Sequence, residues 1–499
     1  QEVLQTAKDF LNDQGYDPER FDNVMSIVRD CSSNCLKYIS VNTTTDSANT
    51  VFSQYLPNVV AYKIRFYNEQ QKEEFHIYVH PMDNIVTGFN HILEEAAMSY
   101  NLSKELARIR VEQFLAQKNY DAGSFKIVES YSETLPNRTD HTFIYESKEG
   151  FEANIKDARL RLTMVVKGDE LAYYRSWYKV PEKWVLAMQK ETFIDSVRKV
   201  IQLLFVPLLL LLVLLKYKHH FNFTNIQWKP IIYTSAGLFV VLFLSQLLNI
   251  RNQFIYYDTT WSSMNFVLSI IFSRLINAFF TSLLFFLILL IGFAYYGSHK
   301  LLDDLKTSQK NGFDILLSSL IVSLGMIAIF IIHKHIAGIY PQLIASPSLN
   351  IPKYLVDNFY LLNFLVDIIF WGLIAAVLYY SLGGIILDSK FLLSFTILFS
   401  IALLPINVDT VPEFLFSYLS LIIVILWLYI CHRFFLRKNL LAYLVTGTSF
   451  FTIAKSYELI STASTKAIVA GYFLIGLFIM MVIWLLIKDK TNWYERILS

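Results

Sequence analysis

Charged residues and cysteines are scarce in this chain of 499 residues. Only 17% of the residues are charged, against about 25% in soluble globular proteins, which argues against an ordinary soluble enzyme. The 43 basic and 41 acidic residues nearly cancel, which excludes a nucleic-acid-binding protein that works through bulk positive charge. Three cysteines exclude a disulfide-dense scaffold and a cysteine-built metal centre, and the sequence predicts no metal ion and no cofactor.

Apolar residues are correspondingly abundant, at 54% of the chain, with 40 Phe and 30 Tyr. After residue 198 they gather into runs that approach or exceed the length needed to cross a bilayer. The sequence therefore predicts a multi-pass α-helical membrane bundle over residues 196–499 with about nine spans. The runs are 200–216, 231–249, 264–296, 314–333, 358–382, 391–406, 412–431, 440–454 and 467–487.

Lysine and arginine are unevenly distributed over the loops between these runs. They gather after spans one, three, five and seven and in the C-terminal tail, as expected of cytoplasmic segments. With nine spans, the N-terminal domain is then extracytoplasmic, and the residue usage favours a bacterial cytoplasmic membrane. Because the sequence begins at Gln1, we expect a signal peptide or an anchor helix ahead of it. Export permits a Cys31–Cys35 disulfide, with two unpaired thiols as the alternative.

Residues 1–195 contain an internal repeat. The segments 7–21 and 111–125 align without gaps and share a Phe-Leu pair, a Tyr-Asp pair and a closing Phe. Each begins as a helix and is followed by alternating strands, at 60–67 and 74–81 in the first copy and at 141–147 and 159–174 in the second. The sequence predicts a soluble α+β domain of two helix-on-antiparallel-sheet repeats, over 1–100 and 101–195, with a hairpin turn at Gly168.

This layout resembles the PepSY-like modules that accompany peptidases and exported regulatory regions. The resemblance implies that the exported domain binds a peptide or a partner protein. The alternative is a spacer that packs on its own membrane section. Both readings stay open at this point.

Three segments of the membrane section resemble the CPBP family of intramembrane proteases, which are related to the type II CAAX prenyl endopeptidases. The CPBP-like core covers about residues 314–487. The three segments are AAVLYYS at 375–381, FSIALLP at 399–405 and NLLAYLVTGTSFF at 439–451. A stretch from Trp228 to the Tyr-Asp-Thr-Thr sequence at 257–260 also fits the family. The resemblance implies a Glu-Glu-x-x-x-Arg motif in one helix, a Phe-x-x-x-His motif and a His-x-x-x-Asn/Asp motif.

None of the family's polar site residues is retained. Ala375 and Ala376 stand where the family has its two glutamates, and Tyr380 stands where it has the arginine. Leu403 replaces the first histidine. Gly447 replaces the second histidine, and Phe451 replaces the amide or carboxylate. Peptide hydrolysis needs a base to activate water and a donor or metal to stabilise the oxyanion, and these side chains supply neither. The sequence therefore predicts a proteolytically inactive relative with no catalytic residues at this site.

Charged and polar residues elsewhere in the apolar runs have two interpretations. Arg274 and Asp367, with Asn363 one turn before it, form either a polar path or a structural pair between spans three and five. Outside this group, Glu94 and Glu95 are expected on a solvated helix face. His333 and His335 are expected at the outer end of span four, without enough ligands for a metal ion. His432 is expected among lipid headgroups.

These observations favour a non-catalytic scaffold or accessory subunit of a membrane complex, with a protein partner and no nucleic acid. The alternatives are a transporter with a path near Arg274 and Asp367, and a protease whose site has moved. Inverted-repeat symmetry would favour transport, and a convergent Glu/His cluster would favour the protease.

Overall fold

The computed structural model describes most of the chain as two compact units. The described residues are 2–28, 32–43, 60–81, 83–118, 120–189, 193–219, 226–248, 250–296, 312–340, 360–398, 400, 410–436, 439–460 and 465–498. The first unit takes in residues of 1–190 and also of 249–270, a segment that lies far along the sequence. The second unit contains the remaining described helices.

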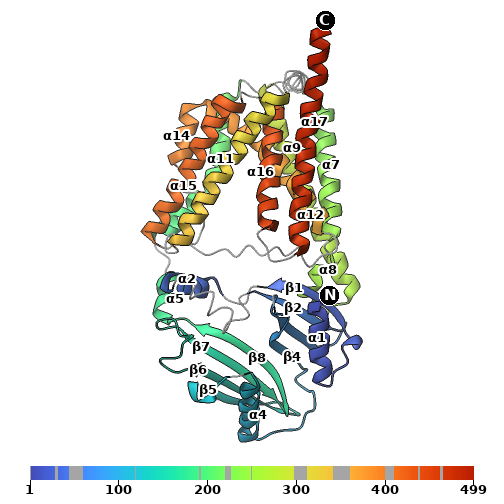
Figure 1. Ribbon diagram of the computed structural model, residues 1–499, viewed down its shortest axis with the longest axis vertical. Helices are drawn as coiled ribbons and strands as arrows, with labels where there is room; N and C mark the ends of the chain where they lie inside the picture. Colours follow the sequence, from blue (N-terminus) through green and yellow to red (C-terminus); the bar gives the residue numbers. More distant parts are fainter. Residues whose placement is uncertain are drawn as a thin grey trace. The chain divides into compact units, whose positions relative to one another are not determined.

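The first unit is built on one antiparallel sheet of eight strands (Figure 1). Its spatial order is β1-β2-β3-β4-β8-β7-β6-β5, so the fourth and the eighth strands meet in the middle. The strands are β1 (Asp22–Val28), β2 (Ala61–Tyr67), β3 (Glu74–Val79), β4 (Val86–Ile92), β5 (Phe125–Thr134), β6 (Thr139–Ser147), β7 (Arg159–Lys167) and β8 (Glu170–Lys179).

Alternating side chains explain why these segments form strands. In β7, Leu160, Leu162, Met164 and Val166 all point into the core and are fully buried. The residues between them point to the other face, as the two-residue period of a strand requires. The β7–β8 turn passes through Gly168, whose φ of 62° favours glycine. The strands expected at 60–67, 74–81, 141–147 and 159–174 and this hairpin turn are confirmed.

Helices cover the core face of the sheet. Helix α1 (Glu2–Asp13) contacts β2, β3 and β4, and helix α4 (Lys104–Gln117) contacts β6 and β7. Helices α2 (Ser33–Asn42) and α5 (Glu182–Gln189) complete this unit's described helices, apart from those of residues 249–270. The same core contains buried residues of α1, α2 and α4 (Ala7, Leu11, Ile39, Ala107, Val111 and Leu115). The expectation for Glu94 and Glu95 is wrong in one respect, because both lie in an exposed turn after β4 and not in a helix.

The second unit is helical. Five described helical segments of the chain are long and apolar enough to cross a membrane, and one of them begins in the first unit. They are Trp228–Leu247, Ser263–Tyr295, Phe313–Ile339, Leu365–Asp388 and Val411–Leu436. These segments indicate an integral membrane protein. The other expected spans fall in α6 (Phe193–Tyr217), α14 (Lys390–Leu398), α16 (Leu440–Ile460) and α17 (Thr465–Leu498), and the count of nine stays a prediction.

Helix α16 is the best-buried helix of this bundle and contacts α11 (Gly312–Ile339), α12 (Tyr360–Leu378) and α17. Two membrane helices change to π-helical turns near their ends. Helix α12 continues through such a turn at Tyr379–Gly383 into α13 (Gly384–Asp388), and α15 (Val411–Ile430) ends in one at Cys431–Leu436. Such turns are rare and occur often at functional sites.

Candidate functional site: the start of a membrane helix held by the sheet domain

The segment before helix α9 (Ser263–Tyr296) packs on the first strands of the sheet. It contains α8 (Ile250–Gln253), a 3₁₀ turn (Phe254–Tyr256) and a loop. Ile255 and Tyr257 form a buried cluster with Val24 of β1 and Tyr67 of β2. Tyr257 is only 2% exposed, and its hydroxyl donates to the Trp261 carbonyl at 2.6 Å. Burial of these rings stabilises the docked segment.

A buried ion pair fixes the backbone of this segment. The Arg65 guanidinium of β2 donates to both carboxylate oxygens of Glu74 in β3, at 2.6 and 2.7 Å. Its remaining nitrogen donates to the carbonyls of Phe254 and Ile255, at 2.9 and 3.4 Å. Because both charges are buried, each is stable there only with its partners in place.

The electrostatics of Glu74 follow from these partners. Burial alone would raise the pKa of this carboxyl. The hydrogen bonds from His76 and Arg65 outweigh burial and hold the pKa at about 2. Burial lowers the pKa of His76, against the hydrogen bond to Glu74. The Thr259 hydroxyl adds a longer hydrogen bond to Glu74 at 3.4 Å, so the carboxylate joins two strands to the loop.

The turn between β2 and β3 caps α9. Its residue Glu69 accepts hydrogen bonds from the backbone N–H of Ser263 at 2.9 Å and from the Ser263 hydroxyl at 2.8 Å. The neighbouring Gln70, at a φ of 58°, donates its N–H to the Thr259 carbonyl at 2.8 Å. A carboxylate at a helix N-terminus satisfies a free N–H and complements the helix dipole. These bonds lower the pKa of Glu69.

The Tyr-Asp-Thr-Thr sequence at 257–260 lies inside this junction. The Asp258 carboxylate accepts from the N–H and the hydroxyl of Thr260, at 3.0 and 2.7 Å, which closes the loop ahead of α9. Sequence reasoning singled out this stretch but missed Arg65, Glu69 and Glu74. Their partners in the segment before α9 lie about 190 positions further along the sequence. No local sequence pattern indicates a contact between residues so far apart.

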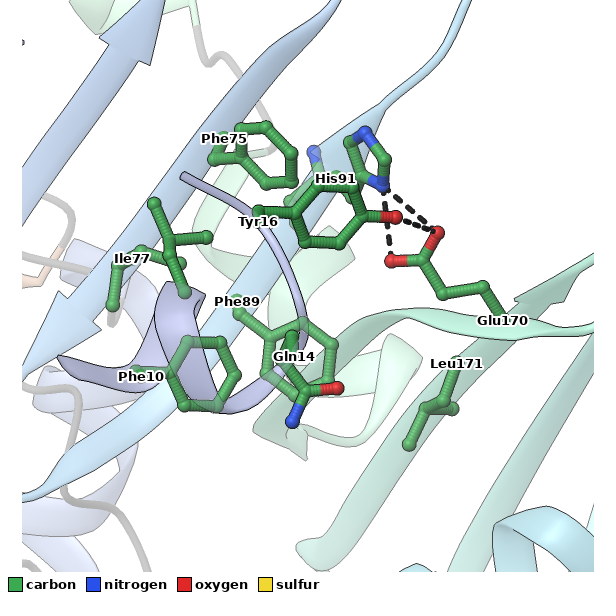
Figure 2. Close-up of a pocket in the computed structure, with 11 residues that line it drawn as sticks. Phe10, Gln14, Tyr16, Phe75, Ile77, Phe89, His91, Glu170 and Leu171 are labelled. Carbon is green, nitrogen blue, oxygen red and sulfur yellow. Dashed lines mark hydrogen bonds and ion pairs between the residues drawn. The ribbon is translucent and has the colours of Figure 1, made fainter. Parts of the chain in front are cut away.

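A second polar centre of the sheet domain surrounds a small pocket beneath α1. The aromatic side chains Phe10, Phe75 and Phe89 line it together with His91 and Glu170 (Figure 2). The space inside is about 10 Å³, close to the smallest volume that holds one water molecule. The pocket therefore has no room for a larger ligand in this conformation.

Most of the positions that we compared with the protease motifs lie in described helices, α12 and α16. A Cβ atom on Gly447 of α16 would lie 2.3 Å from the Gly372 carbonyl oxygen and 3.1 Å from the Ala376 Cβ of α12. Ala376 and Tyr380 are buried, whereas Ala375 and Phe451 are half-buried. Leu403 lies outside the described residues. The two helices thus meet backbone to backbone at Gly372 and Gly447.

The polar residues of the membrane runs lie in two different helices. Arg274 of α9 and Asp367 of α12 are both half-buried, and the polar path and the structural pair both stay predictions. Asn363 belongs to α12, but its side chain is outside the described part. Cys35 is buried in α2, and Cys31 is outside the described residues, so their disulfide stays a prediction.

The histidines expected at the membrane surface have defined partners. His333 of α11 contacts the Ser420 hydroxyl at 3.0 Å. The headgroup expectation for His432 is wrong, because its side chain is 3% exposed. Its two ring nitrogens lie 2.5 Å from the Tyr443 hydroxyl and 3.2 Å from the Asp388 carboxylate. The neighbouring Arg433 suggested an interface, whereas the π-helical turn directs His432 into the bundle.

Among the described residues, no three or more His, Cys, Asp or Glu side chains are arranged to hold a metal ion. No protein-family model matches the chain, and neither a curated protein nor a solved structure matches it. The junction between the sheet domain and α9 is therefore assigned from its own geometry.

Proposed function

We propose that this protein is a non-catalytic scaffold or accessory subunit of a membrane complex. Its sheet domain binds a partner protein or peptide. The contact between the sheet domain and the segment that starts α9 transmits this binding to the membrane helix. The observation that carries the proposal is the set of contacts from Arg65, Glu69 and Glu74 to the segment that starts α9. Because α9 begins in the first unit and continues into the second, a shift of the β2–β3 hairpin changes how this membrane helix starts.

The packing of α12 on α16 supports the non-catalytic part of the proposal. A hydrolytic site needs space for a peptide bond, a water molecule and the groups that polarise them. At Gly447 and Ala376 that space is filled by the Gly372 backbone. This favours a degenerate member of the CPBP-like proteases over an active one.

The free edge of the sheet supports peptide or partner binding. Strand β1 is contacted by α8 and the 3₁₀ turn, whereas β5 pairs with β6 alone among the described strands. An exposed edge strand can accept a partner's strand through main-chain hydrogen bonds. Tyr131 of β5 is 54% exposed, so its side chain can contact such a strand.

The finer architecture belongs to the same proposal. We propose nine spans, a bacterial cytoplasmic membrane, an extracytoplasmic sheet domain and a cytoplasmic C-terminus. We also propose that the sheet domain arose by duplication of a PepSY-like module. The order of elements supports duplication, since α1 precedes β1–β4 and α4 precedes β5–β8.

The test is affinity purification of the full chain in mild detergent, followed by mass spectrometry. We expect a stoichiometric companion with the wild type. Tyr131→Lys should lose it, because lysine blocks strand addition at an edge. Tyr100→Lys is the matched control, since Tyr100 is 80% exposed in a loop outside β5. A lone monomer, or equal loss in both variants, contradicts the proposal.

A proteolysis assay tests the competing hypothesis of a protease with a moved site. In the described part of the bundle, the buried side chains of His432 and Tyr443 form a hydrogen-bonded group with Asp388, which is not buried. Tyr443 is 1% exposed, which leaves a substrate no access to it. We expect no cleavage from the wild type. Cleavage that His432→Ala abolishes would overturn the non-catalytic assignment.

A further inference from the structure

The two halves of the eight-stranded sheet meet at a short seam. Strands β4 and β8 are joined by only two residue pairs, Phe89↔Tyr174 and Asn90↔Tyr173. Every other neighbouring pair of strands is joined by at least six. With so few ladder hydrogen bonds, the contact between the halves depends more strongly on side chains at this seam than elsewhere.

His91 is the central side chain of that contact. It follows the paired residues of β4, is 3% exposed, and stacks on the Phe75 ring with 4.1 Å between centroids. Its Nδ1 lies 3.0 Å from both carboxylate oxygens of Glu170 in β8. Its Nε2 lies 3.1 Å from the carboxylate of Glu73, which precedes β3. Figure 2 shows the His91 ring and the Tyr16 hydroxyl both directed at Glu170.

The arrangement has a preferred protonation state. A neutral imidazole carries one N–H, whereas an imidazolium carries two. With a carboxylate at each ring nitrogen, only the imidazolium donates to both. Deprotonation leaves a lone pair opposite one carboxylate, and Glu73 is the one free to turn away because its side chain is 39% exposed.

The other charged and titratable groups around His91 do not replace this charge. Lys167 of β7 donates to the His91 carbonyl at 2.7 Å, and the Tyr16 hydroxyl donates to Glu170 at 2.8 Å. Asp169, next to Glu170, accepts from the Ser99 hydroxyl at 2.8 Å. Burial acts to raise the pKa of Glu170, but the hydrogen bond and charge of His91 lower it below its ordinary value. The lowered pKa favours the ionised form of Glu170.

We propose that His91 is a protonation-dependent clasp between the two halves of the sheet. When the ring is charged it holds Glu73 and Glu170 together and the seam is closed. When the ring loses its proton, the bond to Glu73 in the same half is lost. The bond to Glu170, which crosses the seam, then joins a neutral ring to a carboxylate and is weaker, so the β4–β8 seam opens more readily. This inference concerns a different site from the junction at α9 and does not depend on the proposed function.

Hydrogen–deuterium exchange of the full chain in detergent tests the clasp at about pH 5.5 and about pH 8, on either side of the range where histidine titrates. Protection factors, which correct for the intrinsic exchange rate, are compared for peptides of β4 and β8 and for peptides of β6 and β7. For the wild type we expect protection at β4 and β8 to fall about tenfold at the higher pH, the size of one charged hydrogen bond. Protection at β6 and β7 should not change.

Variants separate the clasp from other titrations. His91→Gln should remove the pH dependence at the seam. His141→Gln is the matched control, because His141 is equally buried but faces the Ser132 hydroxyl and the Leu102 carbonyl, which carry no charge. It should behave like the wild type. The inference is overturned if the wild-type seam is equally protected at both pH values, or if His91→Gln keeps the pH dependence.

A variant at the partner across the seam decides the question should His91→Gln fail to fold. Glu170→Gln keeps the size of the side chain and removes the charge that faces His91 from β8. We expect it to fold and to lose most of the pH dependence at the seam. A wild-type response from Glu170→Gln would contradict the clasp.

Discussion

Glu74 joins β2, β3 and the segment ahead of α9 through one carboxylate. Its oxygens accept from Arg65, with Thr259 and His76 as further partners, and the side chain is almost fully buried. A buried charge of this kind is stabilising only while it stays ionised and paired. Acid is therefore the simplest probe of the junction.

We predict that the junction weakens in acid through Glu74. The folded-state pKa of about 2 lies below the ordinary value of 4.5, so the stabilisation is complete above about pH 4.5 and is lost as the pH falls toward 2. It amounts to about 3 kcal/mol. Thermal unfolding measured from about pH 6 down to about pH 3 should show this loss.

Glu74→Gln should lower the neutral-pH stability and flatten the acid slope. Glu149→Gln serves as the control, since Glu149 is 93% exposed, and it should keep the wild-type slope. An unchanged slope in Glu74→Gln would contradict the assignment.

The junction residues were beyond sequence reasoning. Arg65 and Glu74 belong to strands that were correctly expected, but the strand pattern alone does not reveal that their charges face each other and Phe254. His432 was misread for a related reason. Its neighbour Arg433 suggested a helix end in water, and a π-helical turn cannot be recognised from hydrophobic periodicity.

At the scale of elements, two membrane helices are in backbone contact. Gly372 and Gly447 allow α12 and α16 to approach at backbone distance, as small residues do in membrane helix packing. The contact determines the spacing of the most buried helix in the bundle.

Gly447→Ala should therefore destabilise the bundle by about 1–3 kcal/mol, because the new methyl group would lie 2.3 Å from the Gly372 oxygen and force the helices apart. Thermal unfolding in detergent measures the effect. Gly237→Ala in α7 (Trp228–Leu247) is the matched control, since a Cβ atom there meets nothing within 4 Å. It should be neutral or slightly stabilising, and equal losses in both variants would contradict this packing.

The start of α9 depends on a residue of another element. Glu69→Ala should loosen its first turn, because the Ser263 N–H and hydroxyl lose their acceptor. Hydrogen exchange of a peptide covering residues 260–270 should become faster. Glu133→Ala, at an exposed position of β5, should leave it unchanged. No difference between the two variants would mean that Glu69 does not order this turn.

Strands could be predicted from the sequence only where apolar and polar residues alternate regularly. β7 alternates clearly, because one face is core and the other is polar. Strands β1, β4 and β5 were missed. In β1, Val24 is buried with Ile255 and Tyr257, whereas Met25 packs against the main core, so apolar residues point to both faces. Strand β4 contains Gly88, and the end of β5 is exposed and polar, so neither carries a strong pattern.

At the scale of the whole molecule, the membrane class was readable from composition alone, and five segments bear it out. The number of spans was less accessible, since α14 has only nine residues and several apolar runs are near the minimum length. The inclusion of residues 249–270 in the sheet unit was not foreseen, because assembly of distant segments leaves no local signal.

We predict that the sheet domain and the start of α7, which follows the first expected span, are on opposite sides of the membrane. Single cysteines at Ser132→Cys and Lys229→Cys, in a background without native thiols, report this with a membrane-impermeant reagent. The first should react in intact cells and the second only after permeabilisation, as the loop charges require. Labelling of both from the same side would contradict the topology.

The contact between Glu69 and Ser263 also bears on biogenesis. A ribosome completes the hairpin that contains Glu69 well before it makes the residues that dock there. The sheet domain can thus fold first and provide the surface on which the later segment docks. A mutation in the hairpin would then disturb a transmembrane helix whose own sequence is unchanged. Mutations in the hairpin and mutations near Ser263 should therefore have the same phenotype.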